Sequence, residues 1–180
     1  GPPSEGSKRW PRRSWFEMPS APLEDGAPSA SRDHLKAQAA PTPLRNVLVA
    51  TARELPHIGY CQSMNFVCAM LLEQLDEERA FWALVAVADS LLRDYYTQSL
   101  FGCRVDQRVF ADLVLQTMPE VSEKVDTTMG FPAVGILSYH WFLTVFLTTI
   151  HDHTTLLRIW DVFCVSGSRS IFQIALAIFE

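Results

Sequence analysis

Residues 127–151 carry no Asp, Glu, Lys or Arg, and this long uncharged segment limits how the chain can fold. Its apolar part, AVGILSYHWFLTVFLTTI, approaches the roughly 20 residues that a membrane-spanning helix needs. However, His140, Thr144 and Thr148 recur at helical spacing and would draw a polar stripe down one face. A histidine at mid-depth in a bilayer is costly without a partner, so we expect a buried helix of a soluble all-α domain. A membrane-embedded helical protein is the alternative.

Size and charge narrow the class of protein further. The chain has 180 residues, 48% of them apolar, which suits about one domain with a packed core. The net charge is −5 and no long basic run occurs, so we expect no nucleic-acid partner. Lys8–Arg9 and Arg12–Arg13 read as a solvated tail, and peripheral contact with lipid or an acidic partner is the alternative. No signal peptide is visible at the start.

The cysteines and histidines do not form the pattern of a metal site. No CxxC pair occurs, and we expect reduced cytoplasmic thiols that are mostly buried. His151 and His153 flank Asp152 without a third ligand in view, so we interpret DHTT as the cap of a helix and expect no metal. The cysteines are Cys61, Cys68, Cys103 and Cys164.

The chain divides into two parts by composition. Residues 1–42 hold most of the eleven prolines, and we expect them to be loosely ordered or a degenerate start of the domain. Residues 43–180 read as successive helices without the alternation that marks strands. Thr42 and Asp76 are the predicted caps of the first and third helices. The helices are expected over residues 43–55, 59–75, 77–96, 105–118, 119–125, 133–150, 154–166 and 168–180.

The segment IGYCQSMNFVCAMLL resembles the YxQ motif of TBC domains, the GTPase-activating modules that act on Rab proteins. Four further blocks are similar to that family in order and spacing, and the resemblance covers about residues 43–180. They are EERAFWALVAVADSLLRDYY, VDQRVFADLV, LSYHWFLTVFL and LLRIWDVFCVSGSRSIFQIALAIF. The resemblance implies an all-α domain of two lobes. Because the chain stops within an apolar helix, we expect the second lobe to be truncated at the C-terminus.

The resemblance also implies a function and a site. Gln62 would be a glutamine finger that enters the active site of a Rab-family small GTPase, with Tyr60 packed beside it and Cys61 facing the lobe interior. The domain would not itself be an enzyme but an activator in trans, working in vesicle trafficking from the cytoplasm or from membranes to which it is recruited. No cofactor is expected, since GTP and Mg²⁺ would belong to the GTPase. Without the resemblance, Gln62 reads as a polar residue that binds local backbone amides.

The sequence departs from the family at the second finger. The family's IxxDxxR motif should place an aspartate near Glu24 and an arginine near Ala27, and the surrounding APLEDGAPSASRDHL has neither the isoleucine nor the arginine in register. Arg32 fits only after a shift of several residues, and Lys36 is a poor substitute because an ammonium lacks the planar fork of arginine. An arginine finger is worth roughly 10³- to 10⁵-fold in GTP hydrolysis. The alternative function is therefore a non-catalytic GTPase-binding adaptor or scaffold with the same fold.

Two tryptophans and an aspartate of the later blocks receive structural roles. We expect Trp141 and Trp160 to lie in the core of the second lobe, and Asp161 to cap a helix or pair inside that lobe.

Overall fold

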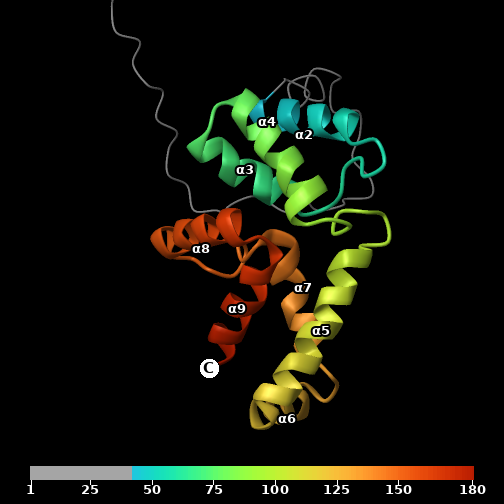
Figure 1. The fold of residues 1–180 in the computed structure, drawn as a ribbon, viewed down its shortest axis with the longest axis vertical. Helices are drawn as coiled ribbons and strands as arrows, with labels where there is room; N and C mark the ends of the chain where they lie inside the picture. The colour runs from blue at the N-terminus through green and yellow to red at the C-terminus, as the bar shows by residue number, and fades with distance from the viewer. Residues whose placement is uncertain (1–41) are drawn as a thin grey trace, which may run out of the picture. The chain divides into compact units, whose positions relative to one another are not determined.

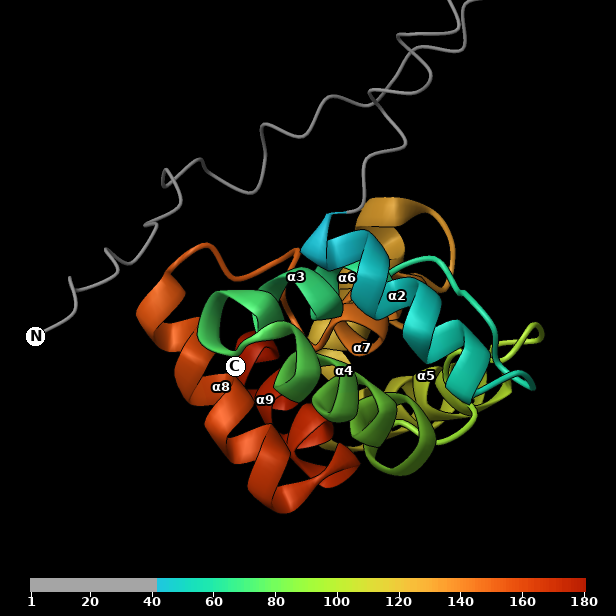
Figure 2. The same ribbon diagram turned by 90° about the horizontal axis from the view of Figure 1, so that it is seen from above.

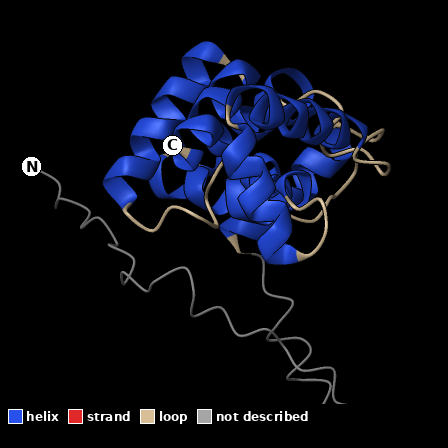
Figure 3. Cartoon of the chain, turned by 90° about the horizontal axis from the view of Figure 1, so that it is seen from below, coloured by secondary structure: helices blue, strands red, loops and turns tan. Residues whose placement is uncertain are grey.

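The computed structural model describes residues 42–180, and this part of the chain is helical without any strand (Figures 1 and 3). The predicted all-α class is therefore confirmed. The expected division between residues 42 and 43 stays a prediction, because residues 1–41 lie outside the described part.

The first group of helices lies at the N-terminal side of the described chain (Figure 1). It contains α2 (Pro43–Glu54), α3 (Met64–Gln74) and α4 (Glu77–Ala86), which runs into a π-helical turn, η2 (Val87–Leu91). All three α-helices pack against one another. Val67 and Leu84 are fully buried among them, which places the apolar stripes of these helices in a shared core.

The predicted caps of this group are confirmed. The Thr42 hydroxyl accepts from the Arg45 amide at 3.2 Å, and Pro43 occupies the first helical position. The Asp76 carboxylate accepts from the Arg79 amide at 2.9 Å. Both side chains satisfy backbone donors that a helix start otherwise leaves unpaired, so these two boundaries follow from local chemistry.

The second group contains five helices. They are α5 (Phe101–Thr117), α6 (Pro119–Met129), α7 (Val134–Thr144), α8 (His153–Ser166) and α9 (Ser168–Phe179). Helix α5 packs along α7 and against α6, and α8 packs against α9 (Figure 2). Phe110 and Phe142 are fully buried with ring centroids 5.5 Å apart, and Phe172 lies 5.4 Å from Phe142. Edge-on aromatic contacts of this kind hold the core of the second group.

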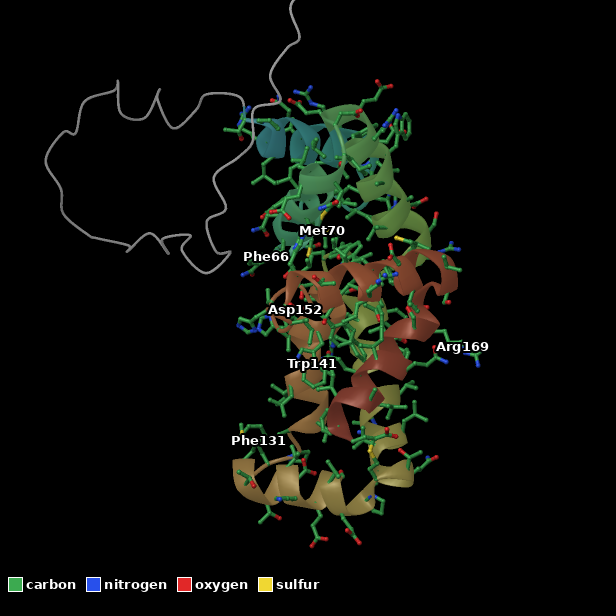
Figure 4. The ribbon with its side chains drawn as sticks, turned by 90° about the vertical axis from the view of Figure 1, so that its left-hand side faces the viewer. Phe66, Met70, Phe131, Trp141, Asp152 and Arg169 are labelled. Atoms are coloured by element: carbon green, nitrogen blue, oxygen red, sulfur yellow. The ribbon has the colours of Figure 1, made fainter. Side chains whose placement is uncertain are left out.

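The two groups pack against each other through α3 of the first and α7 of the second. Met70 of α3 is buried on the side that faces the second group (Figure 4). The arrangement confirms the predicted two lobes.

The uncharged segment is not one long helix. Its first residues, 127–129, end α6, and a second helix covers only Val134–Thr144. The chain then leaves α7 through Val145 and Phe146, whose φ angles are both positive. The Thr144 hydroxyl is buried, donates to the His140 carbonyl at 2.6 Å and lies 3.2 Å from the Thr148 hydroxyl. Thr144 and Thr148, two residues of the predicted polar stripe, therefore form hydrogen bonds at the C-terminal end of α7. Among the described residues no helix is long and apolar enough to cross a bilayer.

The capping interpretation of DHTT is confirmed. Asp152 accepts from both the amide and the hydroxyl of Thr155, at 2.8 and 2.7 Å, and this bonding lowers the pKa of the Asp152 carboxyl. No cluster of metal-ligating side chains occurs within residues 42–180.

Several predicted boundaries are wrong. Helix α3 begins at Met64 rather than at residue 59, and the third predicted helix ends as α4 and η2 instead of reaching Tyr96. Helix α5 begins at Phe101, before the predicted start at residue 105, and Gly102 is its second residue. Helix α6 continues to Met129, beyond the predicted end at residue 125.

Of the three roles expected in the later blocks, one is confirmed, one is met only by partial burial and one is wrong. Trp160 is 4% exposed, as expected for the core, although its indole nitrogen has no hydrogen-bond partner among the described residues. Trp141 is half-buried, with its ring 5.6 Å from that of Phe179. Asp161 is exposed in the middle of α8, so the expectation that it caps or pairs inside the lobe is wrong.

Candidate functional site

The candidate site lies on the loop between α2 and α3, residues 55–63, which we call the finger loop. Leu55 is buried and anchors its start, and its carbonyl accepts from the amides of Ile58 and Gly59 at 3.0 and 2.8 Å. Gly59 has a φ of 67°, a conformation that costs glycine little and other residues more. The chain therefore turns sharply directly before Tyr60.

A second turn follows at the start of α3. Ser63 is buried and has a φ of 83°, in the left-handed region that residues with a side chain rarely occupy. The Cys61 amide donates to the Met64 sulfur at 3.3 Å, and the Met64 amide donates to the Cys61 carbonyl at 3.2 Å. These short-range bonds hold the backbone on both sides of Gln62.

Tyr60 and Gln62 project from this braced loop. The Tyr60 side chain is 59% exposed, and Gln62 is exposed as well. The Gln62 carboxamide forms no hydrogen bond with the rest of residues 42–180, and α3 has no side-chain cap. Gln62 thus does not serve the local backbone, which was the structural interpretation of this residue. Its oxygen can accept and its nitrogen can donate to a group outside the described chain.

Cys61, between the two exposed residues, is half-buried. Burial raises the pKa of the Cys61 thiol. The thiol also contributes electrostatically to the raised pKa of Tyr96 and of Cys103, where burial is again the largest cause. The finger loop therefore exposes Tyr60 and Gln62 and partly buries the Cys61 thiol between them.

One ion pair joins the finger loop to η2. The His57 Nε2 lies 3.7 Å from an Asp89 carboxylate oxygen, and both side chains are more than half exposed. Exposed pairs of this kind contribute little, typically about 0–1 kcal/mol, so backbone turns rather than charge hold the loop.

The residues considered for the second finger, including Arg32, lie outside the described part of the chain. Two arginines within it, Arg79 and Arg108, pair with Asp76 and Asp112 on their own helices. The Met64 sulfur, which accepts from the Cys61 amide, was not predicted as part of the loop, because nothing in the sequence near Gln62 indicates this contact. The roles of Gln62 and Tyr60 stay predictions.

Comparisons with known proteins agree with this architecture. A model of the Rab-GTPase-TBC domain matches residues 29–180. TBC1 domain family member 2B of Xenopus tropicalis is 42% identical over 143 residues, 76% of this chain and 14% of the relative. The human protein of that name is 41% identical over the same shares. TBC1 domain family member 2A of Bos taurus is 39% identical over 142 residues, 78% of this chain and 15% of the relative.

The chain thus spans 14% to 15% of the length of these relatives. No solved structure matches the chain. The family model nevertheless covers most of the chain and includes the finger loop and every described helix. The chain belongs to the Rab-GTPase-TBC domain family.

Proposed function

We propose that this domain is a GTPase-activating module for a Rab-family small GTPase and supplies Gln62 in trans. The observation that carries the proposal is the exposed Gln62 carboxamide, which has no hydrogen bond within residues 42–180 and stands on a loop braced by two turns. A side chain that is presented this way without a structural task is suited to a second molecule. Family membership supplies the class of that molecule, a Rab.

The chemistry of GTP hydrolysis explains why an amide is useful. The attacking water must be held in line with the γ-phosphate, and positioning accounts for much of the catalysis of phosphoryl transfer. The Gln62 oxygen would accept a hydrogen bond from the water while its nitrogen donates to a phosphate oxygen or to the GTPase backbone. Tyr60 would rest against the GTPase and limit how far the loop can move. GTP and Mg²⁺ belong to the GTPase, and the domain needs no cofactor of its own.

The size of the stimulation by this chain depends on whether an arginine acts on the GTP phosphates together with Gln62. An arginine finger contributes roughly 10³- to 10⁵-fold, or about 4–7 kcal/mol of barrier, because its planar fork stabilises charge on the phosphoryl oxygens. The family motif that carries it is not matched near Ala27, so we propose Arg32 as the candidate within the chain. Without such a residue we expect weak stimulation.

Multiple-turnover GTP hydrolysis by a panel of Rabs tests the proposal. We expect the chain to stimulate at least one Rab and Gln62→Ala to abolish the stimulation. Gln116→Ala is the matched control, since Gln116 is an exposed glutamine on α5, and it should leave the rate unchanged. Arg32→Ala in the same assay measures the contribution of that arginine. Stimulation that survives Gln62→Ala would exclude Gln62 as the finger.

The unmatched arginine motif favours a second candidate function, a GTPase-binding adaptor without catalytic effect. An adaptor would bind a Rab in a pull-down or calorimetric titration without raising its hydrolysis rate, and this binding would tolerate Gln62→Ala. In either role we propose a cytoplasmic protein of vesicle trafficking. Recruitment to membranes is part of that proposal.

A further inference from the structure

The finger loop ends in a β-turn formed by residues 61–64. The Met64 amide donates to the Cys61 carbonyl, three residues earlier, at 3.2 Å. Ser63, the third residue of the turn, has a φ of 83° and a ψ of −21°, close to the values that this position takes in a type II turn. Gln62 is therefore the second residue of the turn, and its side chain is exposed at the corner.

A second hydrogen bond closes the same turn in the opposite direction. The Cys61 amide donates to the Met64 sulfur at 3.3 Å, so residues 61 and 64 are joined twice across Gln62 and Ser63. A β-turn by itself uses only the carbonyl of its first residue and leaves the amide of that residue to find another acceptor. Cys61 is half-buried, where an amide without an acceptor is costly, and the Met64 thioether supplies one.

Met64 connects this exposed turn to the core of the first group of helices. It is the first residue of α3 and is 1% exposed, whereas Tyr60 in the loop is 59% exposed. Within residues 42–180, no other side chain forms a hydrogen bond with the backbone of the finger loop. The buried sulfur is thus the one side-chain acceptor in the described chain that holds the backbone beside Gln62.

We propose that Met64 is a positioning residue for Gln62: its buried sulfur accepts from the Cys61 amide and thereby fixes the turn that presents the Gln62 carboxamide. This role rests on the proposed function of Gln62. Misplacing a reacting group by about 1 Å can cost on the order of 100-fold in rate. A thioether is a weak acceptor, so its loss should displace the turn without unfolding the domain. The effect falls on the hydrolysis step within the complex rather than on the contact with the GTPase.

Met64→Leu removes the sulfur and keeps an apolar side chain of similar volume. We expect the maximal stimulated rate, at saturating domain, to fall by roughly 10-fold while the half-saturating concentration changes less than about threefold. Met70→Leu is the matched control, because Met70 is also buried in α3 and its sulfur accepts no hydrogen bond within residues 42–180. It should change the melting temperature by a similar amount and keep the stimulated rate. Equal rate losses in both variants would overturn the proposal.

Hydrogen exchange supplies a readout that does not require GTPase activation. In Met64→Leu the Cys61 amide loses its acceptor and should exchange faster than in Met70→Leu or in the unchanged chain. Unaltered exchange of this amide would overturn the role of Met64 whatever the kinetics show. Faster exchange in a chain that activates no Rab would instead uphold Met64 as the support of the turn and reject the function proposed for Gln62.

The unchanged chain provides a further test if Met64→Leu does not fold. The Cys61 amide donates to the sulfur and should be protected from exchange. The Gln62 amide donates no hydrogen bond within residues 42–180 and should exchange freely. Equal exchange of the two amides would contradict the proposal.

Discussion

Ser63 combines burial with a left-handed backbone directly after the exposed Gln62. Such a conformation costs a non-glycine residue about 1–2 kcal/mol, and native structures retain it only where the surroundings hold it in place. The Ser63 hydroxyl forms no capping bond to α3, so the side chain does not compensate for the strain. The strained residue is what directs Gln62 outward before the helix begins.

Ser63→Gly should therefore stabilise the fold, by up to about 1 kcal/mol, because glycine occupies positive φ without the steric penalty. Ser63→Val should destabilise it, since a β-branched side chain is a strong outlier in this region. Urea denaturation of the two variants checks both signs. A valine variant as stable as the glycine variant would show that the backbone at position 63 is not strained.

At the scale of the element, the start of α5 lies so close to the preceding turn that residue 102 has no room for a side chain. A Cβ at Gly102 would lie 2.6 Å from the Arg93 carbonyl oxygen and 3.0 Å from the Tyr95 ring. The Gly102 amide also donates to the Asp94 carbonyl at 3.0 Å. Helix α5 can begin under this turn only because residue 102 has no side chain.

Gly102→Ala should destabilise the domain by roughly 1–3 kcal/mol, although alanine is the better helix former, because backbone atoms must move to admit the methyl group. Gly135 offers a matched comparison: it is the second residue of α7, and a Cβ there would meet only the Gln107 carbonyl at an ordinary 3.6 Å. Gly135→Ala should be neutral or stabilising by up to about 1 kcal/mol. The melting temperatures of both variants decide between these outcomes. Equal changes in melting temperature would contradict the steric conflict expected between a methyl group at residue 102 and the Arg93 carbonyl.

At the scale of the whole described domain, the aromatic cluster around Phe142 joins helices from three places in the chain. Its ring contacts Phe110 of α5, which is fully buried, and Phe172 of α9, which is half-buried. By contrast, Phe131 is 44% exposed in the turn between α6 and α7 (Figure 4).

Phe142→Ala should lower the free energy of unfolding by about 3–5 kcal/mol, through lost burial and the cavity left behind. Phe131→Ala should change it by roughly 0.5 kcal/mol, as is usual for a surface position. The denaturation midpoints of the two variants provide the measurement. Losses of similar size would mean that the cluster around Phe142 is not the core of the second group.

The residue pattern alone determined the helical class and several helix starts. Thr42, Asp76 and Asp152 cap their helices through an amide three residues away, so a short stretch of sequence contains everything that the cap requires. Gln62 and Tyr60 were identified by resemblance; both side chains are exposed, and their roles stay predictions. These features could be predicted because their causes are local or lie in a motif.

The tertiary structure alone decided where α3 begins and where α7 ends. The buried Tyr96 hydroxyl donates to the carbonyl of Leu143 in the last turn of α7, 47 residues away in sequence, and neither position indicates the other until the helices pack. The helix predicted from residue 59 begins at Met64 because the left-handed Ser63 must first reverse the chain, and the burial that holds Ser63 comes from the folded domain. Local propensity is too weak to specify such points, since long-range packing supplies the free energy that maintains a strained backbone or a buried phenol.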